Sequence, residues 1–182
     1  MKTKTLLSIF VGMAVSVSAS ALASTPASYD TKFNVSANVP DSVLITDAGG
    51  VPVTEVDVVL TPAPTGYMEA NTETLKLWNN DVSGLDVTLT MDDSQSSTGD
   101  AFTLYSSQGG VLNSMTYKIS TITSAGEAQF AASGDSNDYT LVANGTHGEL
   151  PVQFKFVSDS LYKDLGKGNY TGVVYANVVA KA

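Results

Sequence analysis

The chain has 182 residues, a formal net charge of −9, no cysteine and no arginine. This length allows one domain of ordinary size with a sizeable core. An acidic chain without a basic stripe argues against nucleic acid or anionic lipid as a partner, because both require cationic groups. The lack of cysteine excludes disulfides, zinc–thiolate sites and cysteine nucleophiles.

The first 23 residues have the order of a secretory signal peptide. Lys2 and Lys4 precede an apolar run from Leu6 to Val17, and the small residues Ala21 and Ala23 follow it. This order predicts cleavage after Ala23 and export of the mature chain. Removal of the two lysines lowers the net charge to −11.

A short alternating stretch, Lys32 to Val39, follows the leader and ends at Pro40. Its period of two predicts a β-strand with one apolar face. We hypothesise that this strand is donated to a neighbouring copy of the chain, although the first strand of a self-contained sandwich would bury the same side chains. The apolar positions are Phe33, Val35, Ala37 and Val39.

Further short apolar runs continue to the C-terminus, separated by turn residues. No stretch keeps a helical period, so the pattern predicts an antiparallel β-sandwich with Greek-key crossovers. We expect residues 24–40 to form an N-terminal extension and residues 41–182 to form the sandwich, with one helical turn between 159 and 167. The expected strands are 43–46, 51–60, 74–78, 85–91, 102–105, 115–122, 139–143, 150–157 and 170–179, with a small edge strand around Gln129 and Phe130.

Two of these runs predict which side chains enter the core. They alternate cleanly between apolar and polar residues, as expected of strands with one buried face. The predicted inward positions are Leu85, Val87, Leu89 and Met91 in the first run, and Leu150, Val152, Phe154 and Phe156 in the second.

The sequence offers no convincing catalytic or metal-binding constellation. His147 is the only histidine and lies between turn residues, where an isolated imidazole is usually solvated. Asp92-Asp93 and the acidic turn 135–138 lack the ligand spacing of a calcium loop. Trp78 could stack on a sugar, but packing at the end of an apolar strand is the commoner role. We therefore expect no enzyme, no cofactor and no metal.

Both ends of the mature chain resemble a known family. The stretches KFNVSANVPDSVLITDAGG and GKGNYTGVVYANVVAKA are similar to the major pilins of class 5, or alpha-type, chaperone–usher fimbriae, such as colonisation factor antigen I and cable pili. Those pilins also have a leader and lack cysteine. The middle of the chain agrees with them only in length and strand character.

The resemblance implies an incomplete immunoglobulin-like sandwich that is completed by donor-strand exchange. Phe33, Val35, Ala37 and Val39 would fill the groove of the next subunit. The chain would be the structural major subunit of an adhesive fimbria, polymerising head to tail. The acceptor-groove residues would be Tyr170, Gly172, Val173, Val174, Tyr175 and Val178.

The implied partners are other copies of the chain, a periplasmic chaperone, an outer-membrane usher, a tip adhesin and a host-cell surface. The chain would cross the periplasm and end in a fimbrium on the bacterial surface. One alternative is a minor or tip subunit that binds host glycans, although such adhesins carry an additional domain and need no donor strand. Another is a self-contained secreted binding domain in which Pro40-Asp41 closes an N-terminal hairpin.

Overall fold

The computed structural model describes residues 33–37, 42–107 and 113–181. The chain divides into two units, residues 1–38 and 39–182. In the first unit, the described residues 33–37 have no regular secondary structure and are exposed. The predicted signal peptide and Val39 lie outside the described residues, so the predicted domain bounds stay a prediction. The described helical residues form no segment of the length and hydrophobicity needed to cross a membrane.

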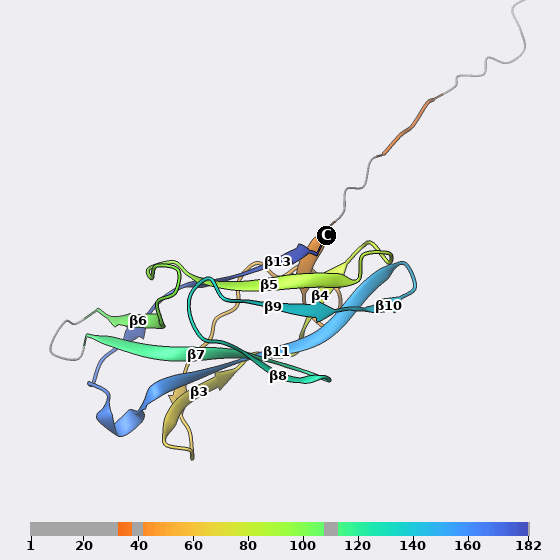
Figure 1. The fold of residues 1–182 in the computed structure, drawn as a ribbon. Coiled ribbons are helices and arrows are strands. Elements are labelled where there is room, and N and C mark those ends of the chain that lie inside the picture. Colours follow the sequence, from red (N-terminus) through yellow and green to blue (C-terminus); the bar gives the residue numbers. More distant parts are fainter. Residues whose placement is uncertain (1–32, 38–41, 108–112, 182) are drawn as a thin grey trace, which may run out of the picture. The chain divides into compact units, whose positions relative to one another are not determined.

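The second unit consists almost entirely of antiparallel strands (Figure 1). Among the described residues of this unit, the one helical element is the single 3₁₀ turn η1, Tyr162–Asp164, within the region where a turn was expected. The strands are β1 Val43–Thr46, β2 Thr61–Pro62, β3 Tyr67–Asn71, β4 Leu75–Asn79, β5 Asp86–Asp93, β6 Phe102–Ser106, β7 Ser114–Thr123, β8 Gly126–Phe130, β9 Ser136–Thr140, β10 Val142–Asn144, β11 His147–Leu161, β12 Tyr170–Thr171 and β13 Val174–Ala180.

The strands form two sheets. The larger sheet has the order β1-β4-β11-β7-β6-β12, with β10 and β3 also on β11, β2 on β3, and β8 on β7. The smaller sheet has the order β13-β5-β9. Neighbours such as β5 and β13 are far apart in the sequence, as in the crossovers predicted for a sandwich.

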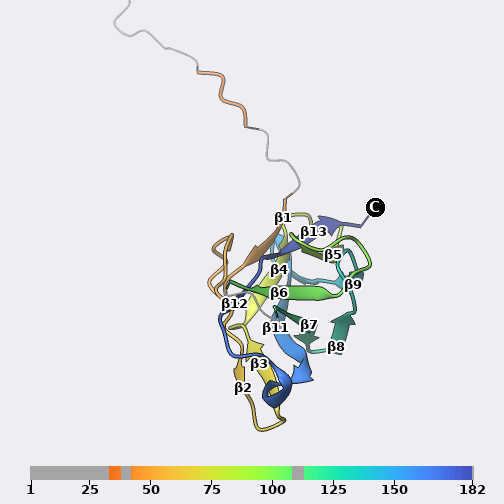
Figure 2. The ribbon, with the colours of Figure 1, turned by 90° about the vertical axis from the view of Figure 1, so that its left-hand side faces the viewer.

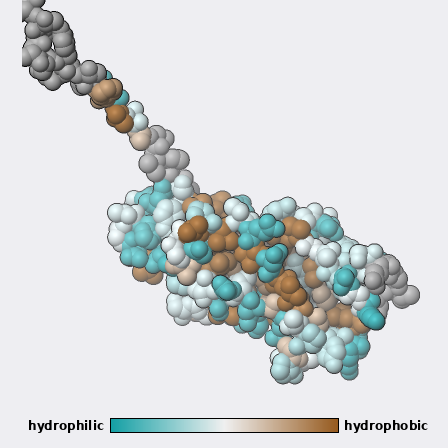
Figure 3. Space-filling model, turned by 180° about the vertical axis from the view of Figure 1, so that it is seen from behind, coloured by the Kyte–Doolittle hydropathy of each residue, from teal (hydrophilic) through white to brown (hydrophobic). Residues whose placement is uncertain are grey.

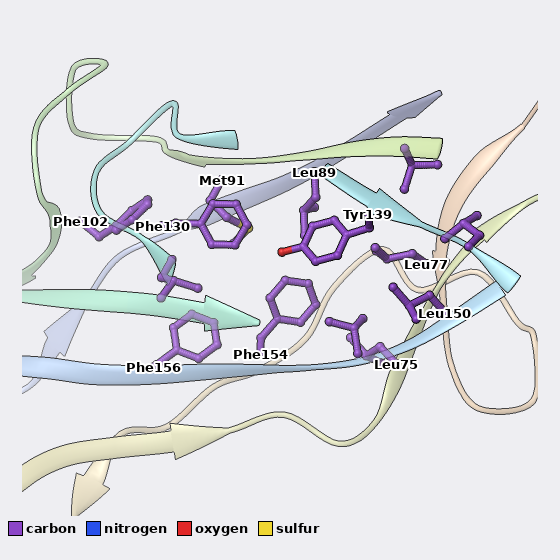
Figure 4. Close-up of a cluster of buried hydrophobic side chains, with 14 of the residues drawn as sticks. Leu75, Leu77, Leu89, Met91, Phe102, Phe130, Tyr139, Leu150, Phe154 and Phe156 are labelled. Carbon is purple, nitrogen blue, oxygen red and sulfur yellow. The ribbon is translucent and has the colours of Figure 1, made fainter. Parts of the chain in front are cut away.

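Side chains from both sheets form one hydrophobic core (Figure 4). Leu89 and Met91 from the small sheet face Phe154 and Phe156 from β11. Tyr139 also enters the core, and its hydroxyl forms a hydrogen bond with Thr121 Oγ1 at 2.5 Å. Burial of these two hydroxyl groups without a hydrogen bond would cost free energy.

The predicted inward face of each alternating run is confirmed. Val87 and Leu89 have no exposed surface and Met91 is 2% exposed, whereas Leu85 is only partly buried. In β11 the positions from Leu150 to Phe156 alternate between buried residues and half-buried or exposed ones, as expected. Alternation identifies these faces because the outer side of each sheet faces solvent.

Several strand predictions differ from the structure, and among them the expected strand 139–143 is divided between β9 and β10. Residues 54–60 form no strand, although Val58 and Leu60 pack against the core. The expected strand 170–179 is divided into β12 and β13. Strand β3 was not predicted, because its polar sequence YMEAN shows little alternation of apolar residues.

Candidate functional site: the open edge beside β13

Strand β13 is an edge strand of the small sheet. It pairs with β5 over its whole length, from Val174 opposite Asp93 to Ala180 opposite Val87. Within the described part of the chain, no strand forms a ladder with its other edge. Strand β1 approaches β13 without pairing with it (Figure 2). The outer edge of β13 therefore offers backbone donors and acceptors to another strand.

The core is incompletely covered on this side. Residues directly opposite on neighbouring strands share a face of the sheet, so Ala176 lies on the same face as Met91, and Val178 on the same face as Leu89. Met91 and Leu89 are buried, yet Ala176 is exposed and Val178 is only partly buried. A further strand beside β13 would bury this face.

The extended segment 54–60 lies on the same side of the sandwich, where β12 leads into β13 (Figures 1 and 2). Val58 and Leu60 pack against the core, but no backbone hydrogen bond to residues 54–60 is found among the described residues. We call the free edge of β13 together with segment 54–60 the open edge. It combines unpaired backbone with apolar side chains.

Hydrophobic residues are exposed along this side of the molecule (Figure 3). Isolated exposed apolar residues are common, but a continuous group usually marks an interface. Val59 is 75% exposed and Tyr175 is 60% exposed. The large exposed apolar side chains of these two elements are Val56 and Val59 of segment 54–60, and Tyr175 and Val179 on the outer face of β13.

The predicted acceptor residues are divided among β12, β13 and the two-residue link between these strands. Tyr170 belongs to β12, pairs with Ser106 of β6, and donates its hydroxyl to the Gly166 carbonyl at 2.7 Å. Gly172 lies between the strands, where a Cβ atom would be 3.0 Å from the Thr103 carbonyl oxygen. The chain therefore passes from one sheet to the other at a glycine that cannot easily be replaced.

The other predicted acceptor residues lie at or in β13 but do not share one face. Val174 and Val178 pack against the core, whereas Tyr175 is opposite Asp92 on the outer face. Val173 accepts a backbone hydrogen bond from Ser94 at 3.0 Å. Sequence reasoning missed Ala176 and Ala180, although they continue the alternation of Val174 and Val178.

The predicted donor residues that the structure describes are exposed. Phe33 is 79% exposed and Val35 is 91% exposed. Ala37 is exposed as well, while Val39 is outside the described residues. Large apolar side chains at such exposure gain free energy when a partner covers them.

Ordinary structural roles explain two other residues that the sequence singles out, Asp93 and Trp78. Asp93 is 3% exposed and accepts hydrogen bonds from the backbone of Gln95 and Thr103 and from the Ser96 hydroxyl. The described residues contain no group of three or more His, Cys, Asp or Glu side chains that could hold a metal ion. Trp78 is half-buried and stacks on His147, with ring centroids 5.6 Å apart.

Similarity to solved structures shows the fold. No family model matches the sequence, and no curated protein matches it. CfaE, the adhesive subunit of CFA/I fimbria of enterotoxigenic Escherichia coli, aligns with a TM-score of 0.53 and 11% identity, over 77% of this chain and 43% of CfaE. A mutant of the same adhesin gives a TM-score of 0.52 and 11% identity, with the same coverage.

A chain from a chaperone–tip adhesin complex of CFA/I fimbriae biogenesis gives a TM-score of 0.46 and 14% identity, over 77% of this chain and 42% of that chain. This chain thus spans less than half the length of the proteins it matches. The described domain has an immunoglobulin-like antiparallel β-sandwich fold, as predicted. Its distinctive feature is the open edge beside β13.

Proposed function

We propose that the chain is a subunit of a chaperone–usher fimbria, and that it is the major structural subunit of the shaft. The observation that carries this proposal is the exposed core-facing side of β13 together with its unpaired edge. The similarity in fold to a fimbrial adhesin supports the same class of protein. The proposed site performs strand acceptance and needs no catalytic residue.

The proposed occupant of the open edge is the N-terminal stretch of another copy. Phe33 and Val35 are exposed and alternate with polar residues, so one face of this stretch can enter a core. Burial of three large apolar side chains would contribute about 5 to 9 kcal/mol before the entropy cost of ordering the strand. Backbone pairing with β13 would add to this energy.

The geometry of donation leads to a fibre. The donor stretch and the open edge are different surfaces of one chain, so each copy can donate to one neighbour and accept from another. Such heterologous contacts propagate instead of forming a closed pair. A periplasmic chaperone would cover the open edge first, an outer-membrane usher would exchange it for the next donor, and the fibre would stand on the bacterial surface.

A tip or minor subunit is the second candidate, because the matched solved structures include an adhesive subunit. A tip subunit would accept a donor strand and bind a host glycan, but it would not need to donate a strand itself. The stretch Lys32 to Val39 favours the shaft position.

The test compares two aspartate substitutions in cells that assemble the fimbria. Val35→Asp changes a 91% exposed side chain, so the cost to the unassembled subunit is within about 0.5 kcal/mol. The same carboxylate would enter the dry core of a neighbour during assembly. We expect chaperone-bound subunit in normal amounts and no fibre, measured by pull-down and electron microscopy.

Val87→Asp is the matched control, because Val87 has no exposed surface within its own domain. This variant should lose both the chaperone-bound subunit and the fibre. The proposal of donation fails if the two variants lower subunit abundance equally. Normal fibres built from Val35→Asp would instead favour a subunit that only accepts a strand.

A further inference from the structure

The turn between β10 and β11 contains an asparagine–glycine pair. Asn144 pairs with His147 across a two-residue turn made of Gly145 and Thr146. Gly145 has φ of 66°, in the left-handed region that glycine accommodates without strain. Asn144, Gly145 and Thr146 are all exposed. Asn144 is the only asparagine of the chain that glycine follows.

The backbone nitrogen of Gly145 is accessible. No hydrogen bond to its N–H is found among the described residues, and an added Cβ atom at Gly145 would have no neighbour within 4 Å. A glycine nitrogen is the least hindered nucleophile in a protein backbone, because no side chain crowds its approach. The side-chain carbonyl carbon of the preceding asparagine is the electrophile within its reach.

The Asn144 amide belongs to a polar cluster on the outer face of the larger sheet. Its Nδ2 donates to Glu149 Oε1 at 2.9 Å, and the other Glu149 oxygen accepts from Lys76 at 2.8 Å. Hydrogen bonds from Lys76 and Asn144 lower the pKa of Glu149, so this carboxyl group is ionised at neutral pH. His147 Nε2 lies 3.6 Å from Glu149 Oε2, and the His147 ring stacks on the Trp78 ring.

We propose that Asn144 is a site of spontaneous deamidation, with water as the only co-reactant. The Gly145 nitrogen forms a bond to Asn144 Cγ, the Cγ–Nδ2 bond breaks, and ammonia leaves with the proton lost from Gly145. Water then opens the cyclic imide. Cleavage at Cγ gives aspartate, whereas cleavage at the backbone carbonyl gives isoaspartate, with no change in oxidation state.

The modification changes the cluster as well as the net charge. A carboxylate at position 144 would no longer donate to Glu149 and would instead repel it. Isoaspartate would also lengthen the backbone of a two-residue turn and disturb the pairing of Asn144 with His147. The modified chain would carry one more negative charge on an already acidic protein.

The test is peptide mass spectrometry of the purified full chain during incubation at neutral and mildly alkaline pH. We expect conversion of amide to acid at Asn144 to be faster than at Asn169 or Asn177, which larger residues follow. Isoaspartate should be detectable by enzymatic methylation. Asn144→Gln is the matched control, since it keeps the amide but forms the larger ring less readily.

Fluorescence gives a second readout, because Trp78 is the only tryptophan. Emission of the aged protein should move toward that of fresh Asn144→Asp, while Asn144→Gln stays constant. The proposal is overturned if Asn144 keeps its amide as long as Asn169 does. It is also overturned if Asn144 of the native protein carries a glycan on its Asn-Gly-Thr triplet instead.

Discussion

A carboxylate at Ala176 tests whether the face beside β13 is built to be covered. Ala176 is exposed in the described structure, so Ala176→Asp should change the stability of the uncomplemented chain by no more than about 0.5 kcal/mol. If a donor strand covers this face, the new charge is buried without a partner. Such burial costs about 3 to 5 kcal/mol, which weakens donor binding by roughly two to four orders of magnitude.

The assay is fluorescence anisotropy of a labelled peptide of residues 31–40 binding to chain 41–182. Two neighbouring variants serve as controls. Asn177→Asp places the same charge on the outer face, opposite Thr90, and should leave the affinity unchanged. Met91→Asp, directly opposite Ala176, alters a side chain that is 2% exposed and should prevent folding. Equal peptide affinity in the Ala176→Asp and Asn177→Asp variants would show that the peptide does not cover the core-facing side of β13.

Three further predictions concern the domain itself. Burial, and to a smaller extent the charge of Asp93, raises the pKa of Tyr117 above its ordinary value of 10.0. Above about pH 10 the folded chain therefore binds more protons than the unfolded chain. The contribution of Tyr117 to the free energy of unfolding is complete below that pH and is lost as pH rises past it. Tyr117→Phe should flatten this alkaline loss in urea titrations, and an unchanged pH profile would contradict the assignment. Asp93→Ala should lower the free energy of unfolding by about 1 to 3 kcal/mol, because the part-buried backbone N–H groups of Gln95 and Thr103 lose their acceptor, and Asp93→Asn should cost less because one side-chain oxygen remains. Gly172→Ala should lower the melting temperature by an amount that corresponds to about 1 to 3 kcal/mol, because the Thr103 carbonyl oxygen lies 3.0 Å from the position of the new methyl group. A melting temperature equal to that of wild type would show that the backbone shifts there without cost.

The sequence predicts the fold class because a strand with one buried face has apolar residues at every second position. Val87 and Leu89 are found buried where that period places them, and so is Phe154 of β11. The same signal mispredicts residues 54–60, since Val58 and Leu60 face the core without forming a ladder. Periodicity reports which side chains are buried and carries no information about backbone hydrogen bonds.

The candidate site shows the same limit. The apolar run after Gly172 is visible in the sequence, but the break between β12 and β13 depends on a close approach to Thr103 from a distant strand. That Ala176 is uncovered also depends on which strand lies beside β13, and a single sequence does not state this. Tertiary pairing therefore determines the site, while local pattern determines its strands.

Thermal unfolding distinguishes a domain whose open edge takes a strand from another copy from a domain that is complete alone. Chain 41–182 should have a low melting temperature alone, because its β13 face and edge are uncovered. Addition of a peptide of residues 31–40 should raise its melting temperature in a concentration-dependent way, and a Val35→Asp peptide should not. A stable monomer whose melting temperature is the same with and without the wild-type peptide would show that the domain is complete alone.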